Sequence, residues 1–247
     1  MIVNIMHFIE LLKFRMAHSK KEILFFVILS VLLVIVQELF FQNALAETGF
    51  IGFLYLSNFV NKAWENCIFN IVMMWAGVLL ILLSTNTQFK RSFWFNSILI
   101  LFISPFVLSI LNLLVIYPLI NNLSLGYSGV AAIFLGYGFF AISIFEYNFL
   151  NVQNFPKRKV YLFYAVFGFF ILLPIASFTF YADPIELSLI GQYGVIDGIY
   201  QTFIQTKINI FIHVVGYVSG LLIPIISSTI FRFKSMTDQF SISDLPN

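Results

Sequence analysis

Residues 22–41 read EILFFVILSVLLVIVQELFF, an apolar run long enough to cross a lipid bilayer as a helix. The hydrocarbon core of a bilayer is about 30 Å thick, and a helix needs about 20 apolar residues to span it. The whole chain has the same character, since 60% of its 247 residues are hydrophobic and 10% are charged. Water-soluble domains carry roughly 25% charged residues. The sequence therefore predicts an all-α membrane protein.

Six stretches are apolar enough to span the membrane, and polar residues or prolines mark the connections between them. These stretches cover 22–41, 63–83, 93–117, 126–145, 160–181 and 206–231. We therefore predict a bundle of six transmembrane helices over residues 22–231. The segment 1–21 precedes the bundle, and the tail 232–247 follows it.

The positions of the basic residues predict the orientation of the bundle. Every Lys and Arg except Lys62 and Lys207 falls in segment 1–21, in the tail or in alternate connections. Because cytoplasmic loops carry an excess of Lys and Arg, both ends of the chain are predicted to be cytoplasmic. An even number of spans agrees with this, because it places both ends on the same side of the membrane. We expect a multi-pass protein in the plasma membrane of a prokaryote.

Two features near the N-terminus leave alternatives open. The residues 44–46 read ALA, which resembles a signal-peptidase site after an apolar stretch. An uncleaved first helix is the better interpretation, because that stretch is long enough to span and the region before it is long. Segment 1–21 is either an amphipathic helix on the membrane or an unstructured basic leader.

Two of the predicted spans open with polar residues at membrane depth, where polar groups are costly and usually face the bundle interior. In the second span Asn66 and Asn70 are four residues apart and share one helix face. The fourth span opens with GYSG, in which Gly126 and Gly129 flank Ser128. Taken singly, the amides are best explained as contacts between helices, and the small residues as close packing.

The sixth span carries a histidine above a glycine stripe. His213, Gly216 and Gly220 share one helix face, and the two glycines form a GxxxG close-packing pair. The predicted topology runs the second, fourth and sixth spans in one direction. Asn70, Ser128 and His213 therefore lie within about 10 Å of the outer ends of three parallel helices. A hydroxyl, an imidazole and an amide at one depth indicate catalysis.

These residues resemble the signature of the rhomboid family of intramembrane serine proteases. That signature has an Asn in the second helix, Gly-x-Ser-Gly at the top of the fourth, and His-x-x-Gly-x-x-x-Gly in the sixth. The corresponding residues here are Asn70, the GYSG at 126–129, and His213 with Gly216 and Gly220. The resemblance implies a six-helix rhomboid-like fold and a Ser–His dyad. It also implies that the substrate is a transmembrane helix of another protein, cut near its extracytoplasmic end within the lipid bilayer.

In such a dyad His213 would remove the proton of the Ser128 hydroxyl and later protonate the leaving amine. The Ser128 backbone N–H and the Asn70 side chain would hold the oxyanion, with Asn66 as a second amide donor. No cofactor or metal is expected. The net charge of +2 gives no indication of a nucleic-acid partner.

The main alternative is a catalytically inactive rhomboid-like protein that binds or escorts membrane clients. Two departures from the family pattern favour it: Asn66, where the family usually has His, and Ala132, where many relatives have an aromatic residue one turn after the serine. The presence of both Ser128 and His213 favours the protease. A small-solute transporter is a third class, disfavoured because the spans carry no charged residues away from their ends and the chain shows no evident internal repeat.

Overall fold

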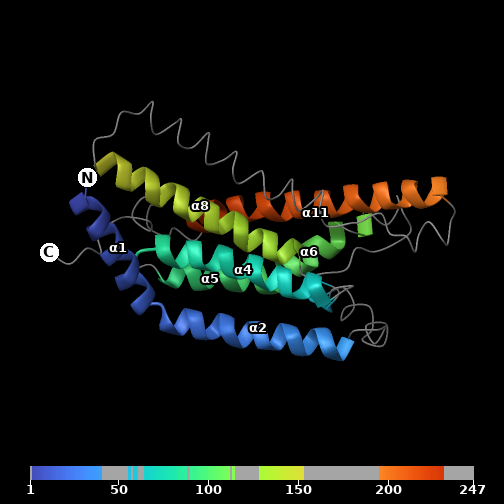
Figure 1. Cartoon of the computed structure of the whole chain (residues 1–247), viewed down its shortest axis with the longest axis horizontal. Coiled ribbons are helices and arrows are strands. Elements are labelled where there is room, and N and C mark those ends of the chain that lie inside the picture. Colours follow the sequence, from blue (N-terminus) through green and yellow to red (C-terminus); the bar gives the residue numbers. More distant parts are fainter. Residues whose placement is uncertain are drawn as a thin grey trace.

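The computed structural model describes residues 2–40, 55–56, 58–60, 64–87, 90–111, 113–114, 128–152 and 195–230. These residues form helices and no strands (Figure 1). The principal helices are α1 (Ile2–Ala17), α2 (Lys20–Phe40), α4 (Trp64–Ser84), α5 (Lys90–Phe102), α6 (Ser104–Leu111), α8 (Ser128–Val152) and α11 (Val195–Ile230).

Within this described part of the chain, five helical segments are long and apolar enough to cross a membrane. They are Lys20–Phe40, Trp64–Ser84, Lys90–Leu111, Ser128–Asn148 and Ile212–Thr229. The prediction of an all-α, multi-pass membrane protein is confirmed. The predicted fifth span at 160–181 lies outside the described residues, and so does tail 232–247.

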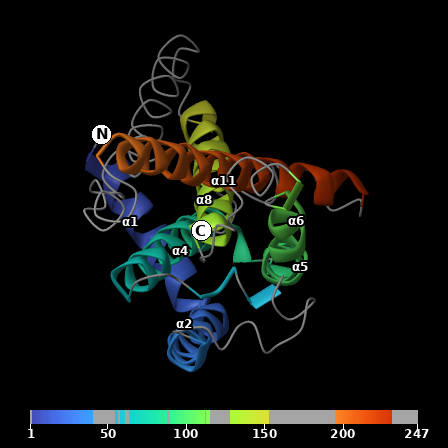
Figure 2. The ribbon, with the colours of Figure 1, turned by 90° about the vertical axis from the view of Figure 1, so that its right-hand side faces the viewer.

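Helix α8 lies between α4 and α11, and α2 lies on the far side of α4 (Figure 2). Glycines allow the three central helices to approach closely. A methyl group added at Gly138 would lie 2.6 Å from the Gly77 carbonyl oxygen, and one added at Gly216 would lie 2.5 Å from the Gly129 carbonyl oxygen. Backbone contacts this short replace side-chain packing, as is common between membrane helices. They fix α4, α8 and α11 against each other.

The predicted third span is interrupted at a proline. Up to Leu111 it consists of α5 and α6, with Ile103 between them and Pro105 in the first turn of α6. Proline has no N–H and its ring crowds the preceding turn, so it breaks regular helical geometry. The helical hydrogen bonds from Ile103 to Leu99 and from Val107 to Ile103 carry the chain across the break.

Helix α11 begins at Val195, whereas the sequence predicted a loop up to about residue 205. Apolar pairs at 195–196, 199–200 and 203–204 recur every four residues, which is the spacing of one helix face. At 1.5 Å per residue the 36 residues of α11 are about 54 Å long, well beyond the thickness of a bilayer core. Figure 1 shows α11 projecting past the first turns of α4 and α8.

Segment 1–21 is helical over Ile2–Ala17, which excludes an unstructured leader. Two side chains of α1, Leu11 and Arg15, are almost completely buried. The Arg15 guanidinium donates hydrogen bonds to the carbonyls of Leu83 (2.9 Å) and Ser84 (2.7 Å) and lies 4.8 Å from the Phe145 ring centroid. The last carbonyls of a helix have no partner within it, so Arg15 completes the end of α4.

A second polar cluster joins the start of α2 to α5. Glu22 accepts a hydrogen bond from Trp94 Nε1 (3.2 Å) and forms an ion pair with Lys90 (3.4 Å). The Lys90 ammonium also donates to the Ser19 hydroxyl, which in turn donates to the Arg15 carbonyl. The two clusters therefore join α1, α2, α4 and α5 at one end of the bundle.

Candidate active site

A small cavity lies between α4, α8 and α11. The described side chains that line it are those of Asn70, Met73, Ser128, Ala131, Ala132, Leu135, His213 and Tyr217. Its volume is about 20 Å³, which is room for about one water molecule. Three residues predicted from the sequence, Asn70, Ser128 and His213, therefore meet at one place although they are far apart in the chain.

Asn70 and Asn66 lie one turn apart on α4 but have different surroundings. Asn70 is 4% exposed and lines the cavity, whereas Asn66 is exposed and is not among the lining residues. A methyl group added at Gly77 would lie 2.7 Å from the backbone nitrogen of Leu135, which sets the register of α4 against α8. In that register the first residue of α8 is level with Asn70. Asn66 lies about one turn before that level, beyond the first residue of α8.

Ser128 is the first residue of α8. The first N–H groups of a helix have no carbonyl partner within the helix, and the partial positive charge of the helix dipole is concentrated there. Serine is also frequent at helix starts for purely structural reasons, because its hydroxyl can cap free N–H groups. What distinguishes Ser128 is the cavity that it shares with His213 and Asn70.

His213 is positioned by the two glycines that follow it on α11. Gly216 packs against Gly129 and Ala132, and Gly220 packs against Ile133 and Tyr137. Both contacts advance along α8 as they advance along α11, so the two helices run in the same direction. Three residues before Gly216, His213 is level with the start of α8. It therefore reaches the cavity beside Ser128.

The two other glycines predicted to pack at the site are Gly126 and Gly129, and the structure describes only Gly129. A methyl group at Gly129 would lie 2.9 Å from a methyl carbon of Leu108 and 3.0 Å from one of Ile212, so this glycine faces flexible side chains. Gly126 lies outside the described residues.

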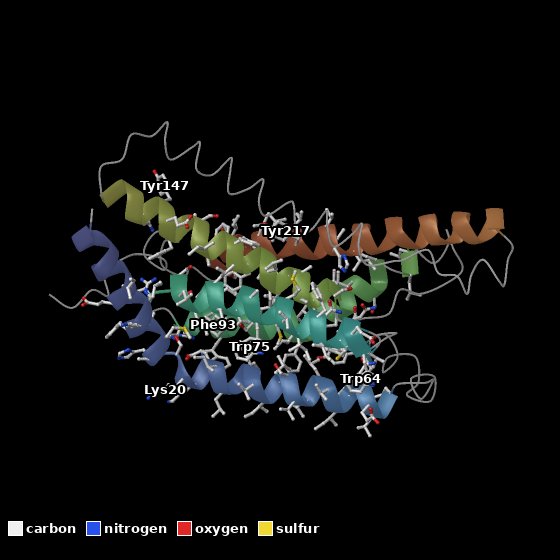
Figure 3. The ribbon with its side chains drawn as sticks, in the orientation of Figure 1. Lys20, Trp64, Trp75, Phe93, Tyr147 and Tyr217 are labelled. Carbon is white, nitrogen blue, oxygen red and sulfur yellow. The ribbon has the colours of Figure 1, made fainter. Side chains whose placement is uncertain are left out.

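Tyr217 also lines the cavity, and it is a polar residue that the sequence patterns did not predict at the site. It is 8% exposed and lines the cavity together with His213. Figure 3 labels Tyr217 on α11. Its position four residues after His213, on the same helix face, is the signal that could have identified it. In a chain with 11 tyrosines and 32 phenylalanines, another aromatic residue in a span is unremarkable. Met73 and Leu135 supply apolar walls of the cavity.

Four of the residues that line this space carry polar groups, namely a hydroxyl, an imidazole, an amide and a phenol, while the surface that faces the space is mostly apolar. The space is large enough for about one water molecule. Within the described ranges, no group of three or more His, Cys, Asp or Glu side chains is gathered where a metal ion could bind.

The fold and the cavity define an all-α, multi-pass membrane protein with polar side chains gathered between three of its helices. A comparison with known protein families, curated proteins and solved structures finds no match to this chain. The likeness to rhomboid proteases therefore rests on the signature residues themselves.

Proposed function

We propose that this protein is an intramembrane serine protease in which Ser128 and His213 form a catalytic dyad. The observation that carries the proposal is the common cavity, which Ser128, His213 and Asn70 reach from three different helices. Close backbone contacts at Gly216 and Gly220 hold α11 against α8, and these two helices carry the two members of the dyad. Rigid elements are needed because catalytic groups must be held in a narrow geometry.

In the proposed reaction His213 removes the proton from the Ser128 hydroxyl as the oxygen attacks a substrate carbonyl. The resulting oxyanion accepts hydrogen bonds from the Ser128 backbone N–H and the Asn70 amide. His213 then protonates the leaving amine, and a water molecule hydrolyses the acyl-enzyme by the reverse sequence of proton transfers. The cavity has room for one such water.

The structure refines the proposed role of the two asparagines. Asn70 is buried at the cavity, so its amide is the oxyanion donor that we propose. Asn66 is exposed, one turn from Asn70, and we assign it no direct contact with the reacting carbonyl.

The proposed substrate is a transmembrane helix of another protein, and the proposed topology has six spans with both ends cytoplasmic. The parallel direction of α4, α8 and α11 supports this topology (Figure 1). In that orientation the site lies toward the extracytoplasmic ends of these helices. A peptide bond in a substrate helix must first be unwound, so segments with glycine or other weak helix formers are the best substrates.

A cleavage assay in proteoliposomes tests the proposal. The substrates are single-span proteins with a different tag at each end and a glycine-containing outer half. Wild-type protein and the control variant Ser219→Ala should cut near the extracytoplasmic end, whereas Ser128→Ala and His213→Ala should not. Ser219 is a suitable control because its hydroxyl donates to the Val215 carbonyl of its own helix (2.7 Å).

Two results would contradict the protease assignment. The first is cleavage that persists in Ser128→Ala. The second is wild-type protein that neither cuts any helical substrate nor reacts with a fluorophosphonate. The second result would favour the alternative, an inactive binding protein, and retention of an uncut client helix by the purified protein would then be expected.

A further inference from the structure

Tyr217 is the one polar residue among those described at the cavity that has no role in the proposed reaction. Its backbone is fixed, because a methyl group added at Gly136 of α8 would lie 3.0 Å from the Tyr217 carbonyl carbon and 3.2 Å from its Cα. Its ring packs against Phe139, with 6.2 Å between ring centroids. The residue is therefore held by α8 on both its backbone and its side chain.

The direction of the Tyr217 side chain follows from helix geometry. Side chains on an α-helix lean toward its N-terminus, so a residue covers the turn that precedes it. For Tyr217 that turn carries His213. Both residues line the same cavity, and Tyr217 lies one helical turn further along α11 than His213.

Two small residues of α8 also line the cavity. Ala131 and Ala132 are the residues of α8 that line the cavity nearest its first turn, and each has only a methyl side chain. The contact between Gly216 and Ala132 is tight, since a methyl group at Gly216 would lie 3.3 Å from the Ala132 Cβ. Leu135 is the large α8 residue among those described at the cavity, and the aromatic residue that lines it comes from α11.

We propose that Tyr217 is a positioning residue for His213. Its ring forms the inner floor of the cavity, limits rotation of the imidazole, and keeps one ring nitrogen directed toward Ser128. It also separates the imidazole from the apolar interior of the bundle. The inference rests on the proposed function, because it assigns Tyr217 a task within the same Ser–His site.

The test is the kinetics of fluorophosphonate labelling in detergent. The maximal labelling rate and the half-saturating probe concentration are measured separately, with thermal unfolding of each variant as a check on folding. Tyr217→Leu should lower the maximal rate about tenfold to a hundredfold and leave half-saturation unchanged, because the probe still binds but the base is misplaced. Tyr217→Phe keeps the ring and should label within about twofold of wild type.

Ser219→Ala is the matched control, because the Ser219 hydroxyl donates to the Val215 carbonyl of its own helix and Ser219 is outside the described lining of the cavity. It should label at the wild-type maximal rate. Equal rates in Tyr217→Leu and wild type would overturn the positioning role while leaving the protease proposal intact. A Tyr217→Phe variant as slow as Tyr217→Leu would overturn the role of the ring. Wild-type protein without any label would overturn the proposed function and this inference together.

Discussion

The burial of Arg15 gives the most quantitative prediction about the fold. Arg15 is fully buried, and its guanidinium donates two hydrogen bonds, at 2.9 and 2.7 Å, to the last carbonyls of α4. A hydrogen bond to a charged group contributes about 1.5–3 kcal/mol net, and a buried acceptor left without a partner costs about 1–3 kcal/mol. Part of this is offset by the cost of burying the charge. We expect Arg15→Ala to lower the free energy of unfolding by about 3–4 kcal/mol.

The assay is equilibrium unfolding in mixed micelles of a mild detergent and SDS, followed by circular dichroism. Lys13→Ala is the matched control, because Lys13 is exposed on the same helix. Its effect should stay within about 0.5 kcal/mol. Arg15→Lys keeps the charge but loses the planar guanidinium that can donate to both carbonyls. The free energy of unfolding should therefore fall by an intermediate amount, about 1–2 kcal/mol. If Arg15→Ala unfolds like Lys13→Ala, α1 is not a structural part of the bundle and the reasoning is refuted.

The other predictions concern the helix contacts and the oxyanion donor. Gly220→Ala should destabilise the bundle by about 1–3 kcal/mol or abolish folding, because its methyl would meet backbone atoms, whereas Gly129→Ala should cost less because flexible side chains can move. Tyr137→Phe removes the buried hydrogen bond from Asn96 (3.1 Å) and should cost about 0.6–1.7 kcal/mol in the same unfolding assay. A larger effect of Gly129→Ala than of Gly220→Ala, or no effect of Tyr137→Phe, would contradict these contacts. Asn70→Ala should lower the cleavage rate about 10²–10³-fold, and equal losses in Asn70→Ala and Asn66→Ala would contradict the assignment of the oxyanion donor.

The sequence predicted the membrane helices where one apolar run corresponds to one regular helix. The stretches 22–41 and 63–83 became Lys20–Phe40 and Trp64–Ser84, because about 20 apolar residues leave little choice of structure in a bilayer. The break at Pro105 and the extension of α11 to Val195 were missed. The break depends on a single residue, Pro105. The extension of α11 follows an apolar pattern that repeats every four residues, but the segment also contains many polar residues and was therefore predicted to be a loop.

The role of Arg15 could not be predicted, because its partners Leu83 and Ser84 lie 68 and 69 residues away in the chain. In the sequence, a basic residue before a span indicates only the orientation of the helix. The structure is needed to show that the Arg15 guanidinium is a buried hydrogen-bond donor. The difference between Asn66 and Asn70 has a similar origin, since the register of α4 against α8 decides which amide faces a neighbouring helix.

At the candidate site, the sequence predicted the polar residues whose spacing matches a known signature, namely Asn70, Ser128 and His213. It did not predict Tyr217, because an aromatic residue in a span has the same appearance whether it faces lipid, the core or a cavity. The role that we propose for it depends on the register that Gly136 and Gly220 impose on α8 and α11.

The central claim is that Ser128 is a nucleophile activated by His213, and the most direct test identifies the residue that a fluorophosphonate modifies. The purified protein is treated with the probe in detergent, digested, and analysed by mass spectrometry. We predict an adduct on Ser128 in wild type and in Ser219→Ala, and none in His213→Ala. An adduct on another residue, an adduct on Ser128 that forms equally well without His213, or an unmodified wild-type protein would contradict the claim.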